Sequence, residues 1–218
     1  MQRHIAFLHT SPVHVETFER LARQADPGLR IEHVVAEELL ANAQRLGANN
    51  PSVVQAVRDA MQKAAAGGAA KVVCTCSTVG GIAETMPTEG RFKAERIDRA
   101  MADRAVQLGP RVLVVAALES TLEPTADLIL QSASALGRDV MVLPHVVEGA
   151  WEHFVAGDMP AYGATIAAAV RALLADASVV VLAQASMAGA AEQLQDLGVE
   201  VLSSPRLGVA RAVADLAE

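Results

Sequence analysis

Two kinds of segment alternate along the chain. Short runs of β-branched and other apolar residues recur over most of its length, and uninterrupted runs of this kind are typical of strands buried on both faces of a sheet. The predicted strands are Ile5–His9, Arg30–Val35, Lys71–Thr75, Phe92–Ile97, Val112–Ala117, Val140–Leu143, Val179–Ala183 and Val199–Leu202. Because longer segments with apolar residues at helical spacing lie between them, the pattern predicts βαβ crossovers, parallel sheets and an α/β fold.

The helical segments carry recognisable start and stop signals. Helices are predicted near Val15–Ala22 and over Val53–Ala66, Met101–Leu108, Leu122–Leu136 and Ile166–Leu174. Asn50 before Pro51 is typical of a helix N-cap followed by the first helical residue. Gly137 is placed to end a helix. Asp98 is expected to cap a helix, with Arg99 exposed or between lobes.

The second half of the chain resembles the first in the order of its predicted strands. The third predicted strand of each half ends in a similar phrase, VVCTCSTVGG at 72–81 and VLAQASMAG at 181–189, so Cys76 and Gln184 occupy corresponding places. We therefore expect two similar doubly wound lobes with parallel four-stranded sheets, related by a pseudo-twofold axis. The first lobe is predicted over 1–97, with a C-terminal helix 206–218 packing back on it, and the second over 98–205.

Polar residues follow several of the predicted strands. In open parallel sheets, ligands bind beyond the carboxyl ends of the strands, so these residues are expected to line an active-site cleft between the lobes. The candidates are His9, Ser11, Cys76, Ser77, Thr78, Ser120, Thr121, Gln184, Ala185 and Ser186. Hydroxyls and helix-start amides suit a small carboxylate. The glycine-rich phosphate and dinucleotide motifs are absent from the sequence, which disfavours nucleotide binding.

Cys76 is the leading candidate for chemistry. It is expected to end a buried strand and open a helix, where the positive helix end lowers a thiol pKa and makes a thiolate available. Cys74, inside the strand, is interpreted as a small buried hydrophobe. No metal site is predicted, because no second cluster of Cys or His completes the Cys-x-Cys pair. His4, His14, His33 and His153 are expected to be surface or packing residues.

Composition narrows the class of protein. The chain has 218 residues, of which 52% are hydrophobic and 3% aromatic, and its net charge is −7. The apolar content excludes a disordered chain. The acidic balance without basic blocks argues against nucleic-acid and membrane-surface partners. With no signal-peptide pattern and no long apolar span, and with only two cysteines, the expected location is cytoplasmic. The oligomeric state is left open, and a homo-oligomer is compatible with the sequence.

Several phrases together resemble the aspartate/glutamate/hydantoin racemase superfamily. They are Val73–Thr78 and its counterpart Val181–Ala188, together with Arg96–Val106, Ala116–Thr121 and Ser203–Arg206. The resemblance implies two flavodoxin-like lobes and no cofactor. It also implies one cysteine from each lobe, on opposite faces of the substrate. One thiolate takes the proton α to a carboxylate or imide carbonyl, and the other thiol returns it.

Carried over residue by residue, the resemblance assigns roles to part of the candidate site. Cys76 matches the first-lobe cysteine, Ser77 and Thr78 match the residues that bind the substrate carboxylate, and Ser120 and Thr121 match a hydroxyl-bearing turn of the second lobe. Gln184, however, stands where the second cysteine is expected. An amide cannot serve as general acid or base, so a symmetric two-thiol racemase is not expected.

The sequence thus predicts a cofactor-independent isomerase of the racemase type. It would act through Cys76 at the carbon α to a carboxylate or carbonyl of a small acid. Two alternatives stay open. One is a single-cysteine decarboxylase of the arylmalonate type, and the other is a non-catalytic protein that binds small acids.

Overall fold

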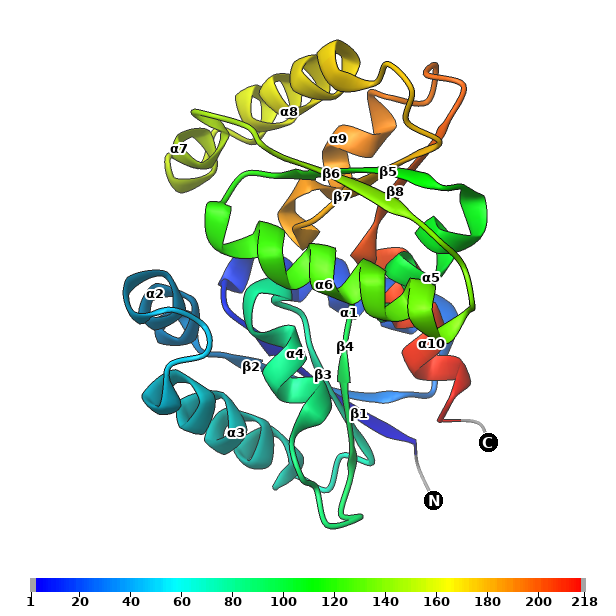
Figure 1. Ribbon diagram of the computed structural model, residues 1–218. Coiled ribbons are helices and arrows are strands. Elements are labelled where there is room, and N and C mark those ends of the chain that lie inside the picture. The colour runs from blue at the N-terminus through cyan, green and yellow to red at the C-terminus, as the bar shows by residue number, and fades with distance from the viewer. Residues whose placement is uncertain (1–2, 217–218) are drawn as a thin grey trace. The chain divides into compact units, whose positions relative to one another are not determined.

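The chain divides into two compact units in the computed structural model of Figure 1, which describes residues 3–216. One unit comprises residues 1–98 and 205–218, and the other comprises residues 99–204. The expected lobe boundaries lie one residue from these, since Asp98 and Pro205 both belong to the first unit. The expected C-terminal helix is α10, Ser204–Ala214, which begins and ends earlier than 206–218. Residues 217 and 218 of that prediction lie outside the described residues.

The first unit is built on a parallel four-stranded sheet with the order β2-β1-β3-β4. Its strands are β1 His4–His9, β2 Arg30–Val35, β3 Lys71–Cys74 and β4 Lys93–Arg96. Every residue of β1 and β3 is buried, whereas the edge strands β2 and β4 are partly exposed. This is why the central strands are continuous apolar runs in the sequence: helices cover both of their faces.

Helices of the first unit pack on opposite faces of its sheet. They are α1 Val15–Ala25, preceded by the 3-10 turn η1 Pro12–His14, then α2 Glu37–Leu46, α3 Pro51–Ala65, α4 Ser77–Thr85 and α10. Apolar residues of α2, α3 and α4 share a core cluster with Leu8, Cys74 and Cys76. Phe7 points to the opposite face, where it contacts Phe18 of α1. The predicted N-cap of α3 is confirmed, because the Asn50 side chain accepts from the Ser52 N–H at 3.0 Å.

The C-terminal helix is fixed to the first unit at two points. Lys71 Nζ, fully buried, pairs with Glu95 at 2.6 Å and with Asp215, just beyond α10, at 3.3 Å. Gly208 of α10 lies so close to the Ile97 backbone that a Cβ at this position would clash with it. The chain therefore returns to the first unit after completing the second.

The second unit repeats the same sheet with the order β6-β5-β7-β8. Its strands are β5 Arg111–Ala116, β6 Met141–Val146, β7 Val179–Leu182 and β8 Glu200–Ser203. The predicted strand ends at Leu143, whereas β6 continues through Pro144 to Val146. Proline is tolerated there because β6 is an edge strand, which needs no backbone donor on its outer side. The predicted pair of similar lobes, each with a parallel four-stranded sheet, is confirmed.

The second unit is completed by its helices. They are α5 Arg99–Leu108, α6 Glu119–Ala135, α7 Ala150–Val155, α8 Met159–Leu173 and α9 Ala188–Glu192, with the 3-10 turn η2 Ala185–Met187 before α9. Gly137 follows α6 with φ +61°, as expected of a helix-ending glycine. Tyr162, Ile166 and Val170 of α8 pack against the buried strands. No helix among residues 3–216 is long and apolar enough to cross a membrane.

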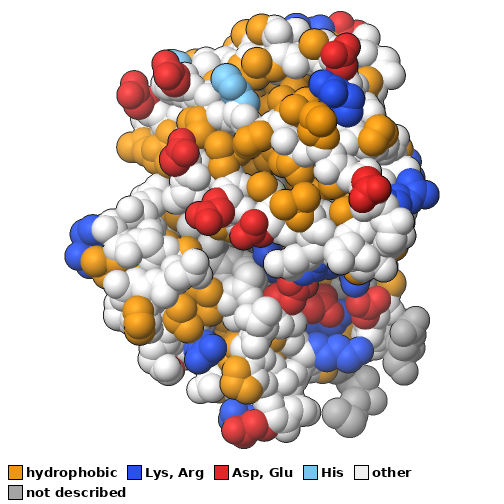
Figure 2. Space-filling model, in the orientation of Figure 1, with side chains coloured by type: hydrophobic (Ala, Val, Ile, Leu, Met, Phe, Trp, Pro, Cys, Tyr) orange, Lys and Arg blue, Asp and Glu red, His pale blue; other side chains and the backbone are white. Residues whose placement is uncertain are grey.

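Hydrophobic side chains gather on one surface of the second unit, seen in the upper part of Figure 2. The exposed side chains, at 43–71%, are Leu130 of α6, Leu136 just after it, Met141 of the edge strand β6, Val155 of α7 and Met159 of α8. An apolar edge strand is a recurrent site of chain association. The homo-oligomer compatible with the sequence stays a prediction.

Candidate active site

Cys76 lies between a buried strand and a helix. It is the N-cap residue of α4, with φ −98° and ψ 116°, and is 8% exposed. Strand β3 ends at Cys74, two residues earlier than Cys76. The next four residues of the chain, 77–80, are buried at the start of α4. Backbone N–H groups of a first helical turn point toward the N-cap, so the Cys76 side chain lies at the end of α4 that favours negative charge.

Cys74 is a structural thiol, as expected. It is fully buried, and its Sγ donates to the Cys76 carbonyl oxygen at 3.7 Å. Burial, together with the neighbouring Cys76, raises the pKa of the Cys74 thiol far above its ordinary value. Cys74 therefore stays a thiol near neutrality, and its weak hydrogen bond helps to hold the backbone at Cys76.

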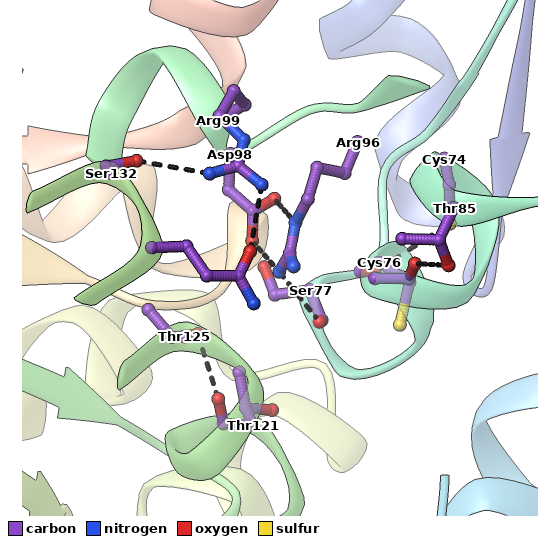
Figure 3. Close-up of polar contacts among 12 residues, drawn as sticks. Cys74, Cys76, Ser77, Thr85, Arg96, Asp98, Arg99, Thr121, Thr125 and Ser132 are labelled. Atoms are coloured by element: carbon purple, nitrogen blue, oxygen red, sulfur yellow. Dashed lines mark hydrogen bonds and ion pairs between the residues drawn. The ribbon is translucent and has the colours of Figure 1, made fainter. Parts of the chain in front are cut away.

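A buried ion pair lies beside the start of α4 (Figure 3). Arg96 donates from Nε and Nη2 to the two carboxylate oxygens of Asp98 at 2.7 and 3.0 Å, and the two residues are 6% and 0% exposed. Burial alone would raise the pKa of Asp98, but the Arg96 charge and hydrogen bonds from Arg96 and Ser77 outweigh it, so the pKa is lowered. Asp98 directly precedes α5, yet its carboxylate serves this pair. The expected capping role of Asp98 stays a prediction, and the ion pair with Arg96 is a second role that the sequence did not indicate.

The ion pair also supports α4 directly. Arg96 Nη2 donates to the Ser77 carbonyl oxygen at 3.4 Å, and the Ser77 side chain hydrogen-bonds the Asp98 carboxylate. The predicted substrate-binding hydroxyl of Ser77 is thus committed to the protein interior. Ser77 and Thr78 lie in the first turn of α4, where both are buried.

Gly80 and Gly81 let the Arg96 guanidinium approach α4 closely. A Cβ on Gly80 would lie 3.1 Å from Arg96 Cβ and 3.2 Å from its Nε, whereas one on Gly81 would meet only Nη1 at 3.4 Å. Alanine in a helix interior gains about 1 kcal/mol over glycine. We expect Gly81→Ala to raise the free energy of unfolding by about that amount. Gly80→Ala should not gain this stability, because its methyl group would press against Arg96. The ion pair with Asp98 holds Arg96 in place, so it cannot move away. Urea unfolding of both variants tests this, and equal gains would contradict it.

His9 is buried rather than ligand-facing. It is 0% exposed, with Nδ1 2.9 Å from Thr75 Oγ1 and Nε2 2.8 Å from His33 Nδ1. Both ring nitrogens therefore bond to protein groups. We assign His9 to the support of the sheet, not to substrate contact. Ser11, the N-cap of η1, is partly exposed just beyond β1 and stays a candidate.

Burial of His9 makes the protein sensitive to acid. Burial first, then the charges of His33 and His14, lower the pKa of His9 from 6.5 to about 3, and burial lowers that of His14 to about 4. Below pH 6.5 His9 binds a proton in the unfolded chain but stays neutral in the folded protein, so the free energy of unfolding falls as the pH falls. We expect a loss of about 1.4 kcal/mol per pH unit from His9 between pH 6.5 and 3.

Urea unfolding at several pH values measures this slope. His9→Gln should flatten it, and His153→Gln, in α7 of the second unit, should not. The same slope in the wild type and in His9→Gln would contradict the assignment.

In the second unit, Gln184 is the N-cap residue of η2 and is oriented by one hydrogen bond. Its Oε1 accepts from the Ala117 N–H at 2.6 Å, so the Nε2 end of the amide points away from that contact. Ala185 follows at the start of η2. Because η2 has three residues and α9 only five, the aligned peptide dipoles here are fewer than in the nine-residue α4. Backbone support for an anion is therefore weaker at Ala185 than at Ser77.

Ser186 has a partner that sequence reasoning missed. Its Oγ lies 2.9 Å from the hydroxyl of Tyr162, the single tyrosine, which is 1% exposed. Burial raises the pKa of Tyr162 to about 12, so its hydroxyl stays protonated and can donate. When Tyr162 donates, the Ser186 proton is directed elsewhere and can reach a ligand oxygen. Neither residue's neighbours in sequence signal this pairing.

Ser120 and Thr121 open α6 in different environments. The Thr121 carbonyl oxygen accepts from Thr125 Oγ1 at 2.8 Å, and Thr121 is buried (Figure 3). Ser120 Oγ is buried and has no hydrogen-bond partner among the described residues. A buried hydroxyl without a protein partner normally bonds to water or to a ligand. This makes Ser120 the strongest ligand-binding candidate of the second unit.

A surface groove elsewhere in the first unit does not contain the predicted site. It is lined by Ala70, Thr88 and residues 90–95, at the start of β4. Parallel strands place their beginnings at the opposite end of the sheet from Cys76, and none of the candidate residues lines this groove. This groove therefore does not locate the site, for which the chemistry around Cys76 is the evidence.

Comparison with known proteins agrees with the resemblance seen in the sequence. A model of the Asp/Glu/hydantoin racemase family matches residues 15–212. A search of curated proteins finds no match to this chain.

Several solved structures share the fold. An aspartate racemase from Picrophilus torridus is 13% identical, with a TM-score of 0.72 over 99% of this chain and 94% of that one. A glutamate racemase from Bacillus anthracis is 15% identical, with a TM-score of 0.74 over 99% and 82%. A variant of arylmalonate decarboxylase is 16% identical, with a TM-score of 0.62 over 98% and 93%. At these identities the likeness concerns the fold alone.

Proposed function

Because the chain belongs to the Asp/Glu/hydantoin racemase family, we propose that it is a cofactor-independent isomerase of the racemase type. It acts at the carbon α to a carboxylate or carbonyl of a small acid, with Cys76 as the group that moves the proton. One observation carries the proposal. Of the two thiols, Cys74 is sealed in a strand, whereas Cys76 stands at the start of α4.

The position of Cys76 supports acid–base work. A thiolate at a helix N-terminus is stabilised by the first-turn N–H groups and by the helix dipole. It can take a proton from a carbon made acidic by an adjacent carboxylate or carbonyl, and the resulting thiol can return one. Charge that develops on the substrate oxygens needs donors, and the first turn of α4 supplies backbone N–H groups for that purpose.

Hydroxyl groups of the second unit stay in the proposed substrate-binding set, as the family resemblance implies. Ser120 Oγ, buried and without a partner in the described protein, would bond a substrate oxygen. Ser186, oriented by Tyr162, would donate to another. Thr78, Thr121, Ser11 and Ala185 remain in the proposed substrate-binding set. His9 and the Ser77 hydroxyl are left out, because the protein already engages them.

Gln184 makes the proposed chemistry asymmetric. With Oε1 held by the Ala117 N–H, its Nε2 can donate hydrogen bonds to a substrate oxygen but cannot move a proton. Cys76 then exchanges protons on one face of the carbon only. A two-thiol racemase would need a second acid–base group, and the sequence has no third cysteine.

A single-thiol decarboxylase is the second candidate. One specific observation favours it: with Gln184 in the place of the second thiol, one thiol remains to protonate the carbanion left by loss of CO₂. The structural likeness to an arylmalonate decarboxylase variant, which concerns the fold, supports keeping this alternative.

A substrate panel distinguishes these functions. Aspartate, glutamate, a 5-substituted hydantoin, allantoin and an arylmalonate would each be incubated with the protein in D₂O and followed by NMR. Exchange of the α-proton supports the proposed proton transfer at that carbon, and release of CO₂ supports the decarboxylase. A ligand-induced rise in Tm without either reaction would overturn the proposal in favour of a binding protein.

A further inference from the structure

A continuous chain of hydrogen bonds crosses the sheet of the first unit. Glu19 Oε2 lies 3.1 Å from His33 Nε2, His33 Nδ1 lies 2.8 Å from His9 Nε2, and His9 Nδ1 lies 2.9 Å from Thr75 Oγ1. Thr75 Oγ1 in turn lies 3.1 Å from the Leu8 carbonyl oxygen. We call Glu19, His33, His9 and Thr75 the relay. It connects α1, β2, β1 and the residue that precedes Cys76.

The relay leads from the surface to the interior. The side chains of Glu19 and His33 are 39% and 14% exposed, whereas His9 is 0% and Thr75 2% exposed. The rings of His9 and His33 stack at 5.1 Å, and Phe7 stacks on His33 at 5.6 Å. Alternate residues of a strand point to opposite faces, so the relay lies on the α1 face and Cys76 on the face covered by α2, α3 and α4. Thr75 is the link between the two.

Hydrogen-bond chemistry allows two arrangements of protons in this relay. Burial would raise the pKa of Glu19, but hydrogen bonds from His33 and Arg23 outweigh it, so Glu19 remains a carboxylate and His33 Nε2 must donate to it. If His33 also carries a proton on Nδ1, it donates to His9 Nε2. His9, which stays neutral, then donates from Nδ1 to Thr75, and the Thr75 hydroxyl donates to the Leu8 carbonyl.

Removal of one proton from His33 reverses the rest of the chain. His33 Nδ1 then accepts from His9 Nε2, His9 Nδ1 accepts from the Thr75 hydroxyl, and the bond from that hydroxyl to Leu8 is lost. Each arrangement satisfies every ring nitrogen, and they differ by one proton at His33. The Thr75 N–H bonds Leu8 O at 2.9 Å in both, so the hydroxyl bond is an added clamp between β1 and the turn before α4.

We propose that the relay is a proton-linked positioning device for Cys76: protonation of His33 turns the Thr75 hydroxyl onto the Leu8 carbonyl and tightens the turn that presents the thiol. Thr75 and His9 are then positioning residues, which act through the backbone at Cys76. The importance of this device rests on the proposed function, but its operation does not. Cys76 is only 8% exposed, so a tighter turn should limit access to its sulfur.

Other groups around the relay can be assigned. The ring of His14, before α1, lies 6.4 Å from that of His9 and makes no hydrogen bond to the relay within residues 3–216, and burial lowers its pKa to about 4. Arg23 of α1 donates to Glu19 Oε1 at 2.9 Å. From β1 and α1, Phe7 and Phe18 present only aromatic surface to His9. Because Glu19 stays a carboxylate and His9 stays neutral, the one proton by which the two arrangements differ belongs to His33.

NMR of ¹⁵N-histidine protein tests the switch directly. Over a pH titration of the folded protein, His9 should change from the Nδ1–H to the Nε2–H tautomer as His33 loses its proton, without itself becoming doubly protonated. His33→Phe keeps the stacked ring, removes both nitrogens and should fix His9 in one tautomer. His14→Phe is the matched control and should leave the change intact. A single His9 tautomer throughout this titration in the wild type would overturn the proposal.

Alkylation of Cys76 tests the consequence. In a Cys74→Ala background, the iodoacetamide rate per thiolate should rise about fivefold as His33 deprotonates, the factor that corresponds to one net hydrogen bond. Thr75→Val should abolish the step, and Thr75→Ser, which keeps the hydroxyl, should restore it. A step that persists in His33→Phe would overturn the proposal. Both readouts are independent of turnover, so failure of the relay and failure of the proposed catalysis are distinguishable.

Discussion

Cys76→Ser should lower turnover of an accepted substrate by about a hundredfold to ten-thousandfold, the usual contribution of a general acid–base group. Serine keeps the size of the side chain, but its hydroxyl holds its proton far more tightly than a thiol does. Only the proton-transfer step should suffer, because the first-turn N–H groups of α4 and the buried Arg96–Asp98 pair remain in place. A fall in kcat with little change in KM is the expected signature.

The neighbouring thiol provides the matched control. Cys74→Ala removes a fully buried thiol with a raised pKa and a weak bond to the Cys76 carbonyl, so it should cost some stability and leave most of the turnover. Steady-state kinetics of the two variants decide the point. Equal activities, or a larger loss in Cys74→Ala, would remove Cys76 from the mechanism.

Asp98→Asn should lower the free energy of unfolding by about 3–5 kcal/mol, because breaking a buried ion pair leaves the remaining charge uncompensated. The buried Arg96 guanidinium would keep its charge and lose the Asp98 carboxylate. Ser77 would also lose the carboxylate that its hydroxyl bonds. The loss should therefore be accompanied by loosening of α4, visible as faster hydrogen exchange in its first turn.

An exposed ion pair with the same two-pronged geometry provides the comparison for Asp98→Asn. Arg171 also makes a two-pronged contact with Asp196, at 2.7 and 2.9 Å, but the two side chains are 43% and 66% exposed. Asp196→Asn should therefore cost far less stability than Asp98→Asn. Urea unfolding of the two variants gives the comparison. Equal small losses would show that the Arg96–Asp98 pair does not hold α4 in place.

The fold could be predicted because strands that are buried on both faces have a recognisable apolar sequence. Strands β1, β3, β5 and β7 are covered on both faces and therefore read as unbroken apolar runs. Strand boundaries were less accurate at the edges: β6 was cut short at Pro144, which an edge strand tolerates. Helix α2 was missed because only Leu39 and Ala43 of its residues are buried, which leaves a weak periodic signal.

The site could be predicted only where one residue's local position decides its chemistry. A cysteine that follows a buried strand and opens a helix can be recognised from the sequence, and Cys76 occupies that position. Pairings between distant segments leave no such local pattern. Ser77 with Asp98, Ser186 with Tyr162, and His33 with Glu19 depend on how the elements pack, so Ser77 was assigned to the ligand and His33 to packing. Gly80 and Gly81 were a missed signal of the close approach by Arg96.

The stereochemistry of deuterium uptake tests the central claim, that Cys76 moves protons without a second acid–base group. A single enantiomer of an accepted substrate would be incubated in D₂O, and NMR with chiral analysis would follow exchange and inversion separately. With Gln184 unable to move a proton, deuterium should enter with retention of configuration much faster than the substrate inverts. Inversion as fast as exchange would contradict the account and would show that another residue, Ser186 with Tyr162 first, acts as the second base.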